Sequence, residues 1–293
     1  MGGVGWRHEA IAEGDMRGKA DAGVQDGLVE TDLQLAQRAV ITGAAVALRH
    51  FGALAELSRE LKADGSVVTA ADRAVETAVR EVLGAARPED SVLGEEQGET
   101  AGNGRRWIID PIDGTRLFVE GDDRWLVLLG LEEDGETVAG VAAHPAQGSI
   151  WWATRGGGAF EGRIVGGRAV AATPIRVDAG GPDTIEGSRL CVVPEEWRPQ
   201  LVAPLKAITA ALPWSIHPGL LVARGEIDLA IQTGGQIWDF AATSLIVTEA
   251  GGSFSGLSGR TRPGPGASLY ARSSALREAA LETLADATHA NAT

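Results

Sequence analysis

The sequence predicts a mixed α/β protein, in which an α+β half is followed by an α/β half. In residues 31–44 and 71–82, apolar residues recur mostly at spacings of three and four, which is the period of amphipathic helices. From Trp125 to Ile175, short β-like runs alternate with acidic or Gly-containing turns, as in an antiparallel meander. Beyond Arg189, strand-like and helix-like segments alternate, which indicates a second sheet covered by helices.

The chain therefore divides into three predicted segments. Residues 1–30 are Gly-rich and charged without sustained periodicity, which favours a flexible N-terminal extension. They contain no apolar core long enough for a signal peptide, and no later apolar run approaches the roughly 18 to 20 residues that span a bilayer. Residues 31–176 form the α+β half and residues 177–293 the α/β half. We expect a soluble, cytoplasmic protein.

The α+β half opens with two predicted helices. Thr31 and Asp32 are candidate caps of the first helix. The second helix follows Thr69 and carries Asp72 in its first turn, where the helix dipole favours a carboxylate whether or not it serves a site. Its apolar face consists of Ala71, Val75, Ala78, Val79 and Val82. The opposite side is expected to be an ordinary solvated surface and carries Arg73, Glu76 and Arg80.

The later elements follow from short patterns. Ala169, Val170 and Ile175 can continue the antiparallel sheet. The α/β half then contains, in order, a strand over RLCVV, a helix over PQLVAPLKAITAAL, a helix over GLLVARG, a strand over IDLAIQ and a helix over WDFAATSLIVTEAGG. The last helix is expected to end at Gly251 and Gly252, because glycine commonly follows a helix C-terminus.

Composition excludes several function classes. The 40 acidic residues against 26 basic ones give a net charge of -14, which disfavours binding to nucleic acids or anionic membranes through bulk electrostatics. With 293 residues, 44% of them hydrophobic, the chain can bury a substantial core. Cys191 is the single cysteine, which excludes an intrachain disulfide framework and a cysteine-based zinc cluster. We expect it to be a small buried residue in a reducing compartment.

The most informative stretch is WIIDPIDGTRLF, residues 107–118. An apolar run leads into Asp110, which predicts a buried strand that ends where the chain breaks at Pro111. Asp113 follows within the same turn. Two carboxylates that close resist joint ionisation unless a cation lies between them, and hard divalent ions such as Mg²⁺ take oxygen ligands of this kind. The stretch therefore predicts a metal site.

A simple turn is the alternative for this stretch alone, because Asp, Pro and Gly are turn formers and the acid can cap a following helix. Three further acidic elements favour the metal site. They are Asp72 within KADGSVVTAAD, Glu95 and Glu96 within SVLGEEQGE, and Asp239 within IWDFAATSLIVTEAGG.

Taken together, these motifs resemble those of the inositol monophosphatase superfamily of metal-dependent phosphomonoesterases. WIIDPIDGT is similar to the family's D-P-x-D-G-T motif, and IWDFAA with EAGG is similar to its W-D-x-A-A and E-A-G-G motif. The resemblance covers roughly residue 31 to the C-terminus and implies the layered αβαβα sandwich of the sugar-phosphatase fold. The stretches SVLGEE and WWATRGGGAF are most similar to the bacterial histidinol-phosphate phosphatase branch.

The resemblance also implies a metal centre with two or three Mg²⁺ ions, which Mn²⁺ can replace. Asp110 would bridge two ions. Glu95 and the carbonyl of Ile112 would complete the first ion's site, and Asp113 with Asp239 would hold the second.

The expected catalytic residues are Asp72, Thr115 and Glu95. By resemblance, Thr115 would be hydrogen-bonded toward Asp72 and would orient and deprotonate an attacking water that the ions activate. The backbone amides of Gly114 and Thr115 would receive the phosphate. Inorganic phosphate would be released without a covalent enzyme intermediate.

The substrate-recognition elements depart from the family. Related enzymes often carry an acidic substrate ligand seven residues before the last metal Asp, where this chain has Gln232. The family normally has a Gly followed by Ser or Asp and then small residues where this chain has Pro213, Trp214 and Ser215. We expect Trp214, Ser215 and Gln232 to be the substrate-recognition residues. His217, a lone histidine in an apolar helical region, is expected to be structural.

Histidinol phosphate is the leading substrate prediction, and a nucleoside, sugar or inositol monophosphate is the alternative. A catalytically silent metal- or phosphate-binding regulatory protein is the rival from another class. Retention of the acidic elements with Thr115 favours the enzyme, because a silent protein needs no water-activating pair. The expected partners are a small phosphorylated metabolite and a second copy of the chain in a homodimer, with no nucleic acid and no membrane.

Overall fold

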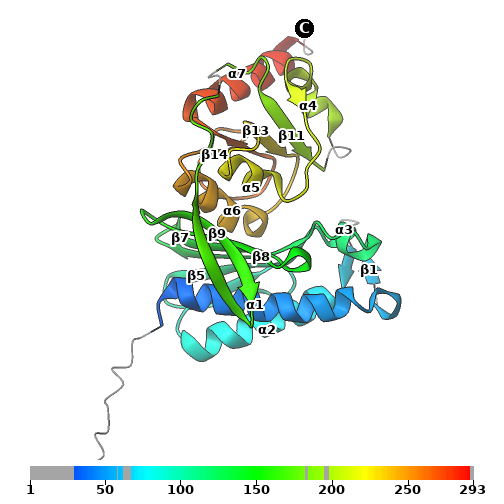
Figure 1. Ribbon diagram of the computed structural model, residues 1–293, viewed down its shortest axis with the longest axis vertical. Coiled ribbons are helices and arrows are strands. Elements are labelled where there is room, and N and C mark those ends of the chain that lie inside the picture. The colour runs from blue at the N-terminus through cyan, green and yellow to red at the C-terminus, as the bar shows by residue number, and fades with distance from the viewer. Residues whose placement is uncertain (1–29, 58, 62–66, 182–183, 195–197, 291–293) are drawn as a thin grey trace, which may run out of the picture. The chain divides into compact units, whose positions relative to one another are not determined.

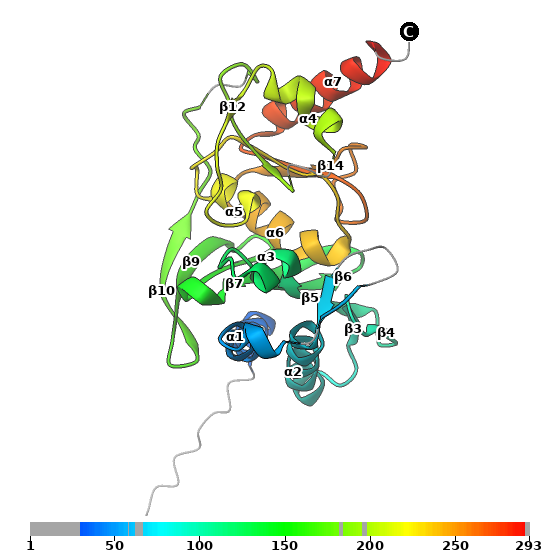
Figure 2. The same ribbon diagram turned by 90° about the vertical axis from the view of Figure 1, so that its right-hand side faces the viewer.

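The computed structural model describes residues 30–57, 59–61, 67–181, 184–194 and 198–290. Apart from Glu30, the expected N-terminal extension lies outside these ranges. Residues Thr31–Thr293 form one compact unit. In Figures 1 and 2, its elements are stacked as helices, sheet, helices, sheet and helices, which confirms the expected αβαβα sandwich. None of the described helices is long and apolar enough to cross a membrane.

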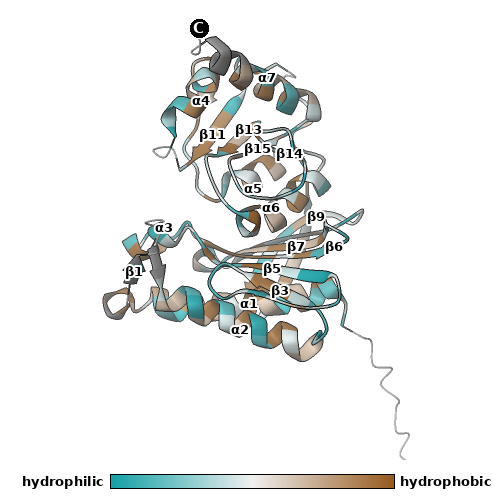
Figure 3. Cartoon of the chain, turned by 180° about the vertical axis from the view of Figure 1, so that it is seen from behind, coloured by the Kyte–Doolittle hydropathy of each residue, from teal (hydrophilic) through white to brown (hydrophobic). Residues whose placement is uncertain are grey.

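The first layer consists of two helices, α1 (Asp32–Phe51) and α2 (Ala70–Ala86). Thr31 and Thr69 are their N-caps, and each takes part in a reciprocal capping box with the residue three positions later. The helices pack on each other and bury their apolar sides against the first sheet. Hydrophilic and hydrophobic residues alternate along both helices, as the teal and brown segments in Figure 3 show. Both predicted helices are confirmed.

The polar side of α2 differs from the prediction. The side chain of Arg73 is 48% exposed, but that of Glu76 is 0% exposed and that of Arg80 only 14%. The reason is tertiary, because both residues bond to the hairpin formed by β3 (Ser91–Gly94) and β4 (Gly98–Thr100). The predicted solvated surface is therefore wrong at Glu76 and Arg80.

The first sheet has eight strands in the order β10-β9-β8-β7-β6-β5-β3-β4. Strands β5 to β10 are antiparallel, which confirms the meander expected over β6, β7 and β8 and its continuation in β10, whereas β9 was not predicted. Strand β3 pairs with β5 in parallel. The meander strands are β5 (Arg105–Asp113), β6 (Leu126–Glu133), β7 (Glu136–His144), β8 (Ser149–Thr154), β9 (Gly158–Val165) and β10 (Arg168–Ile175). Smaller elements of this half are η1 (Leu54–Glu56), β1 (Arg59–Leu61), β2 (Val67–Thr69), α3 (Thr115–Glu120) and η2 (Pro145–Gln147).

Strand β5 runs past Pro111, so the predicted break at that residue is wrong. Asp110 pairs with Leu128 and Asp113 with Leu126, which leaves one extra residue on β5 between these pairs. A bulge of this kind accommodates proline, which has no amide hydrogen for the ladder. The bulge carries the strand onward to Asp113 before the chain turns into α3.

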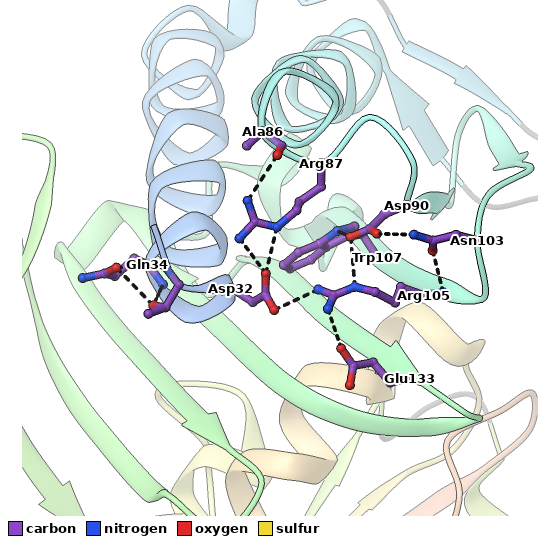
Figure 4. Close-up of polar contacts among 10 residues, drawn as sticks. Asp32, Gln34, Ala86, Arg87, Asp90, Asn103, Arg105, Trp107 and Glu133 are labelled. Carbon is purple, nitrogen blue, oxygen red and sulfur yellow. Dashed lines mark hydrogen bonds and ion pairs between the residues drawn. The ribbon is translucent and has the colours of Figure 1, made fainter. Parts of the chain in front are cut away.

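A polar network fixes the opposite end of β5 (Figure 4). Asp90 accepts hydrogen bonds from Trp107 Nε1 at 2.9 Å and from Arg105 Nε at 3.3 Å. Arg105 also forms ion pairs with Asp32 of α1 at 2.8 Å and with Glu133 of β6 at 2.7 Å. The network thus joins the first helix to the sheet at the start of β5, away from the strand end that carries Asp113.

The second sheet has five strands in the order β12-β11-β13-β15-β14. Its strands are β11 (Arg189–Val193), β12 (Ala210–Ala211), β13 (Leu229–Gln232), β14 (Ser253–Gly256) and β15 (Ser268–Ala271). The outer helices are α4 (Pro199–Lys206) and α7 (Ser274–Ala290). The helix predicted through Leu212 is too long, because its last residues pair with β11 as strand β12. The sequence reading missed β14, β15 and α7.

Helix α6 (Ile237–Glu249) lies between the two sheets, beside α5 (Pro218–Ala223). It contacts strands of the first sheet on one side and β14 on the other. Two glycines of the first sheet allow α6 to pack closely against it. A Cβ atom on Gly130 would lie 2.9 Å from the Cβ of Ala241, and one on Gly140 would lie 2.9 Å from the carbonyl oxygen of Ala242. Larger side chains at these positions would push α6 away from the first sheet.

Candidate active site

Three carboxylates meet where β5 ends and α6 begins. Asp110 and Asp113 come from β5, and Asp239 lies in the first turn of α6. Each offers one oxygen, and these oxygens all lie within 4.8 Å of one another. The structure therefore brings together three of the predicted metal ligands, although Asp239 is 126 residues from Asp113 in sequence.

The electrostatics of this group call for a cation. Burial raises the pKa of Asp110 well above its usual value, and the negative charges of Glu95, Asp113 and Asp239 raise it further. Burial raises the pKa of Asp113 to about 7. Oδ1 of Asp110 is buried and accepts no hydrogen bond from any described residue. A divalent cation among these oxygens would satisfy Oδ1 and restore the ionised carboxylates, so the donor set fits a hard metal ion.

Glu95 lies beside this group, in the turn that follows β3. The parallel pairing of β3 with β5 sets Gly94 next to Ile109, and the amide of Glu95 donates to the carbonyl of Ile109 at 3.3 Å. After burial itself, the negative charge of Glu95 raises the pKa of Asp110 more than any other neighbouring charge does. Backbone pairing therefore brings Glu95 beside Ile109, the residue before Asp110, although its carboxylate is not among the oxygens that converge within 4.8 Å.

Asp72 and Thr115 are in contact, as expected from the resemblance. Thr115 Oγ1 lies 3.1 Å from Asp72 Oδ1 and 3.0 Å from the carbonyl oxygen of Ile112, and its hydroxyl can donate to either. The other carboxylate oxygen of Asp72 accepts from the amide of Thr69 at 2.8 Å and from its hydroxyl at 2.6 Å. Asp72 has no exposed surface. Burial raises its pKa, and these hydrogen bonds oppose the rise.

Gly114 shapes the turn between Asp113 and Thr115. Its φ of 89° lies in the left-handed region, which a glycine adopts without the steric cost of a Cβ atom. Gly114 is the N-cap of α3, so the turn lets the chain leave β5 and begin the helix at Thr115 at once. Both predicted phosphate-binding amides belong to this turn.

Gln232 forms a hydrogen-bonded chain with Asp239 and His217. Gln232 Nε2 donates to Asp239 Oδ1 at 3.3 Å, and His217 Nε2 lies 3.2 Å from Gln232 Oε1. The amide of Gly219 donates to His217 Nδ1 at 3.1 Å, so Nε2 carries the ring proton and donates to Gln232. Burial lowers the pKa of His217 to about 4, which keeps the ring neutral. This geometry agrees with a structural role for His217.

Trp214 packs against Arg124, which the sequence reading missed. The Arg124 guanidinium lies 4.2 Å from the centre of the Trp214 ring, and its Nη1 donates to the Trp214 carbonyl at 3.1 Å. Asp122 fixes the same guanidinium through Nη2 at 2.6 Å. No local pattern predicts the contact of Arg124 with Trp214, because the two residues are 90 positions apart in the sequence. Ser215 is exposed.

Arg124 and Trp214 line a cavity of about 370 Å³. The remaining lining residues are Leu190, Val192, Lys206, Ala211, Leu212 and Pro213. The backbone of Arg124 lies beside the Gly114 turn, because a Cβ atom on Gly114 would lie 3.6 Å from the Arg124 carbonyl oxygen. The Arg124 side chain thus links Trp214 to the segment beside the predicted phosphate-binding turn.

Comparison with known proteins decides the family. Residues 28–291 match the inositol monophosphatase family. The chain belongs to that family. Over 228 residues it is 39% identical to a histidinol-phosphatase of Mycobacterium tuberculosis, covering 75% of this chain and 85% of the relative. Over 240 residues it is 37% identical to a Streptomyces griseus protein named glucose-1-phosphate thymidylyltransferase, covering 80% and 88%.

A solved inositol monophosphatase from Zymomonas mobilis superposes with a TM-score of 0.71 at 28% identity, covering 87% of this chain and 97% of that one. Membership in the inositol monophosphatase family makes the protein a phosphoric monoester hydrolase that acts on phosphate monoesters. The resemblance deduced from the sequence motifs is confirmed, and the silent regulatory protein is not favoured.

Proposed function

We propose that this inositol monophosphatase family member is a Mg²⁺-dependent phosphatase whose centre is the group formed by Asp110, Asp113 and Asp239. The observation that carries this proposal is the convergence of their oxygens within 4.8 Å, with Oδ1 of Asp110 buried and unpartnered among the described residues. Oxygen-only ligand sets suit Mg²⁺ and also admit Mn²⁺.

In the proposed centre, Asp110 would contact two ions. Glu95 and the carbonyl of Ile112 would complete the first site, and Asp113 with Asp239 the second. When bound, the ions would supply positive charge to the phosphoryl oxygens and lower the pKa of a water molecule. The raised pKa of Asp110 supports this assignment, because the metal-free group carries more negative charge than its buried position tolerates.

The residues Thr115 and Asp72 would handle the attacking water. The Thr115 hydroxyl can accept a hydrogen bond from water while it donates its own hydrogen to Asp72 Oδ1, 3.1 Å away. Because Thr69 occupies the other oxygen of Asp72 with two hydrogen bonds, Oδ1 is the oxygen directed to Thr115. The amides of Gly114 and Thr115 would hold the phosphate as the water oxygen attacks phosphorus and the bond to the leaving group breaks.

Histidinol phosphate is the proposed substrate, supported by the histidinol-phosphatase relatives. A nucleoside, sugar or inositol monophosphate is the second candidate. Gln232 favours the second candidate, because a neutral amide bonded to Asp239 offers no carboxylate to the ammonium of an amino alcohol. The flat indole of Trp214, which lines the cavity with Arg124, favours a ring-containing leaving group. We also propose that the enzyme works in the cytoplasm as a homodimer.

A phosphate-release assay tests the proposal. The purified enzyme is given histidinol phosphate, inositol monophosphate and a nucleoside monophosphate, each with Mg²⁺ and with EDTA. We expect release only with Mg²⁺, and full activity after exhaustive chelation would refute the metal centre. A preference of about tenfold or more in kcat/KM, worth about 1.4 kcal/mol, would identify the substrate.

The name of the Streptomyces griseus relative calls for one additional reaction in this phosphate-release assay. Its name denotes transfer of a thymidylyl group, which needs no attacking water, whereas the Asp72–Thr115 pair favours hydrolysis in this chain. Glucose 1-phosphate with deoxythymidine triphosphate should therefore yield free phosphate and no nucleotide sugar.

A further inference from the structure

Glu76 is a buried charge that the proposed reaction does not use. It lies one helical turn after Asp72 on α2 and has no exposed surface. Its Oε2 accepts a hydrogen bond from the amide of Glu96 at 2.7 Å, and its Oε1 accepts one from the amide of Gln97 at 3.1 Å. Because both oxygens are already occupied by the backbone of the β3–β4 turn, Glu76 is not itself placed to hold an ion.

Arg80 completes the same arrangement. Its Nε donates to Glu76 Oε1 at 2.8 Å, which balances the buried charge. Its Nη1 donates to the carbonyl of Val92 at 3.3 Å and its Nη2 to that of Gly98 at 2.5 Å. Glu76 therefore binds the backbone amides of the turn, and Arg80 binds a backbone carbonyl of each of the two flanking strands.

Gly94 shows how closely the turn is fitted to this pair. A Cβ atom on Gly94 would overlap the Glu76 carboxylate. Gly94 also pairs with Ile109 of β5, so the Glu76 carboxylate lies against a residue that pairs directly with the strand that carries Asp110. The missing side chain at Gly94 leaves the space that the carboxylate occupies.

The β3–β4 turn is held by this pair as well as by the backbone pairing of β3 with β5. It carries Glu95, and the three residues of β4 that follow it are all exposed, so burial of β4 contributes little to holding the turn. A buried ion pair rarely stabilises a fold more than apolar residues of similar size, but it fixes the groups that it bonds in one geometry. What Glu76 fixes is the backbone immediately beside Glu95.

We propose that Glu76 is a positioning residue that holds Glu95 against Asp110. The inference rests on the proposed function, in which Glu95 is a metal ligand. Helix α2 then serves the centre twice, since Asp72 orients Thr115 and Glu76, one turn later, sets the turn that bears Glu95. Carboxylates that orient metal ligands typically contribute about 10- to 100-fold to metal affinity.

The test compares Glu76→Gln with Glu81→Gln, an exposed position on the same helix. Mg²⁺ binding is measured by calorimetry without substrate, and hydrogen exchange of the Glu96 and Gln97 amides is measured in metal-free protein. In Glu76→Gln, we expect Mg²⁺ to bind about 10- to 100-fold more weakly and both amides to exchange at least about tenfold faster. Glu81→Gln should match the wild type in both.

A second variant keeps the charge and removes the space for it. Gly94→Ala should weaken Mg²⁺ binding like Glu76→Gln, and it serves as the test if Glu76→Gln does not fold. Unchanged Mg²⁺ affinity or unchanged amide exchange in a folded Glu76→Gln would overturn the role of Glu76, with the proposed function intact. A wild type that binds no Mg²⁺ would instead overturn the metal centre and this role with it.

Discussion

Gln232 donates its side-chain amide to Asp239, with 3.3 Å between Nε2 and Oδ1. The other end of the amide accepts from His217, so both ends of Gln232 are bonded inside the protein. In Gln232→Leu, we expect weaker Mg²⁺ binding by about tenfold and an unchanged ranking of substrates, because the amide orients Asp239. Calorimetry and kcat/KM for three monoesters check this. A changed ranking with normal Mg²⁺ affinity would show that Gln232 contacts the leaving group.

Thr115→Ala should lower kcat by roughly 100-fold or more with Mg²⁺ binding largely kept, because only water orientation is lost. Thr115→Ser, which retains the hydroxyl 3.1 Å from Asp72, is the matched control and should keep most of the activity. Steady-state kinetics at saturating Mg²⁺ measure both. Near-normal turnover in the alanine variant would remove Thr115 from the proposed mechanism.

Mg²⁺ should stabilise the fold more at pH 8 than at pH 5. Burial raises the pKa of Asp113 to about 7 and that of Asp110 well above its usual value, so the metal-free folded state holds protons that the unfolded state releases. The stability of the metal-free protein therefore falls as the pH rises from about 4 toward 7. Mg²⁺ among the ionised carboxylates offsets this loss, so its stabilising effect is larger at the higher pH. Denaturant unfolding with Mg²⁺ or with EDTA measures this. Equal stabilisation at both pH values would contradict it.

His217 should reduce stability in acid. Its pKa is about 4 in the fold, so between pH 6.5 and 4 only the unfolded state gains a proton, and stability decreases as the pH falls. The loss between pH 7 and pH 5 is about 2 kcal/mol. In His217→Phe, this contribution should vanish, and the difference between the two unfolding curves in EDTA isolates it. Parallel pH dependences would show that His217 takes up its proton as readily in the fold as in the unfolded chain.

Asp90→Asn should destabilise the fold by about 1 to 3 kcal/mol without changing kcat. Asp90 is buried and accepts hydrogen bonds from Trp107 and Arg105, and removal of its charge leaves Arg105 less well paired. This network lies at the start of β5, whereas Asp110 and Asp113 lie toward its end. Chemical denaturation and steady-state kinetics check the two halves of the prediction. A large loss of kcat would indicate coupling along the strand.

Local patterns predicted the features that depend on neighbours in sequence. The helix after Thr69, the strand leading to Asp110 and the helix carrying Asp239 all follow from periodicity and capping residues. The resemblance supplied the pairing of Asp72 with Thr115, which the structure places 3.1 Å apart. The bulge at Pro111 was not predicted. A proline inside a strand is tolerated where the pairing with the neighbouring strand shifts, and the register of β5 with β6 is not evident from the local sequence.

The sequence could not predict the features that depend on distant partners. Glu76 and Arg80 have the spacing of a surface ion pair, and only the β3–β4 hairpin buries them. Arg124 meets Trp214 across 90 residues, and Gln232 meets His217 across 15. No periodic pattern encodes contacts of this kind, because tertiary packing alone decides them.

The gap between α6 and the first sheet has a consequence for how the enzyme can diverge. Its width depends on Gly130 and Gly140, where an added methyl group would meet Ala241 or Ala242 at 2.9 Å. Asp239 is carried by α6, and Asp110 and Asp113 by the sheet, so the gap sets the distance between the two sources of carboxylates. If the proposed metal centre holds, a mutation at either glycine should therefore change the size of the cation that fits between α6 and β5, and cation preference can change among descendants that keep every acidic residue.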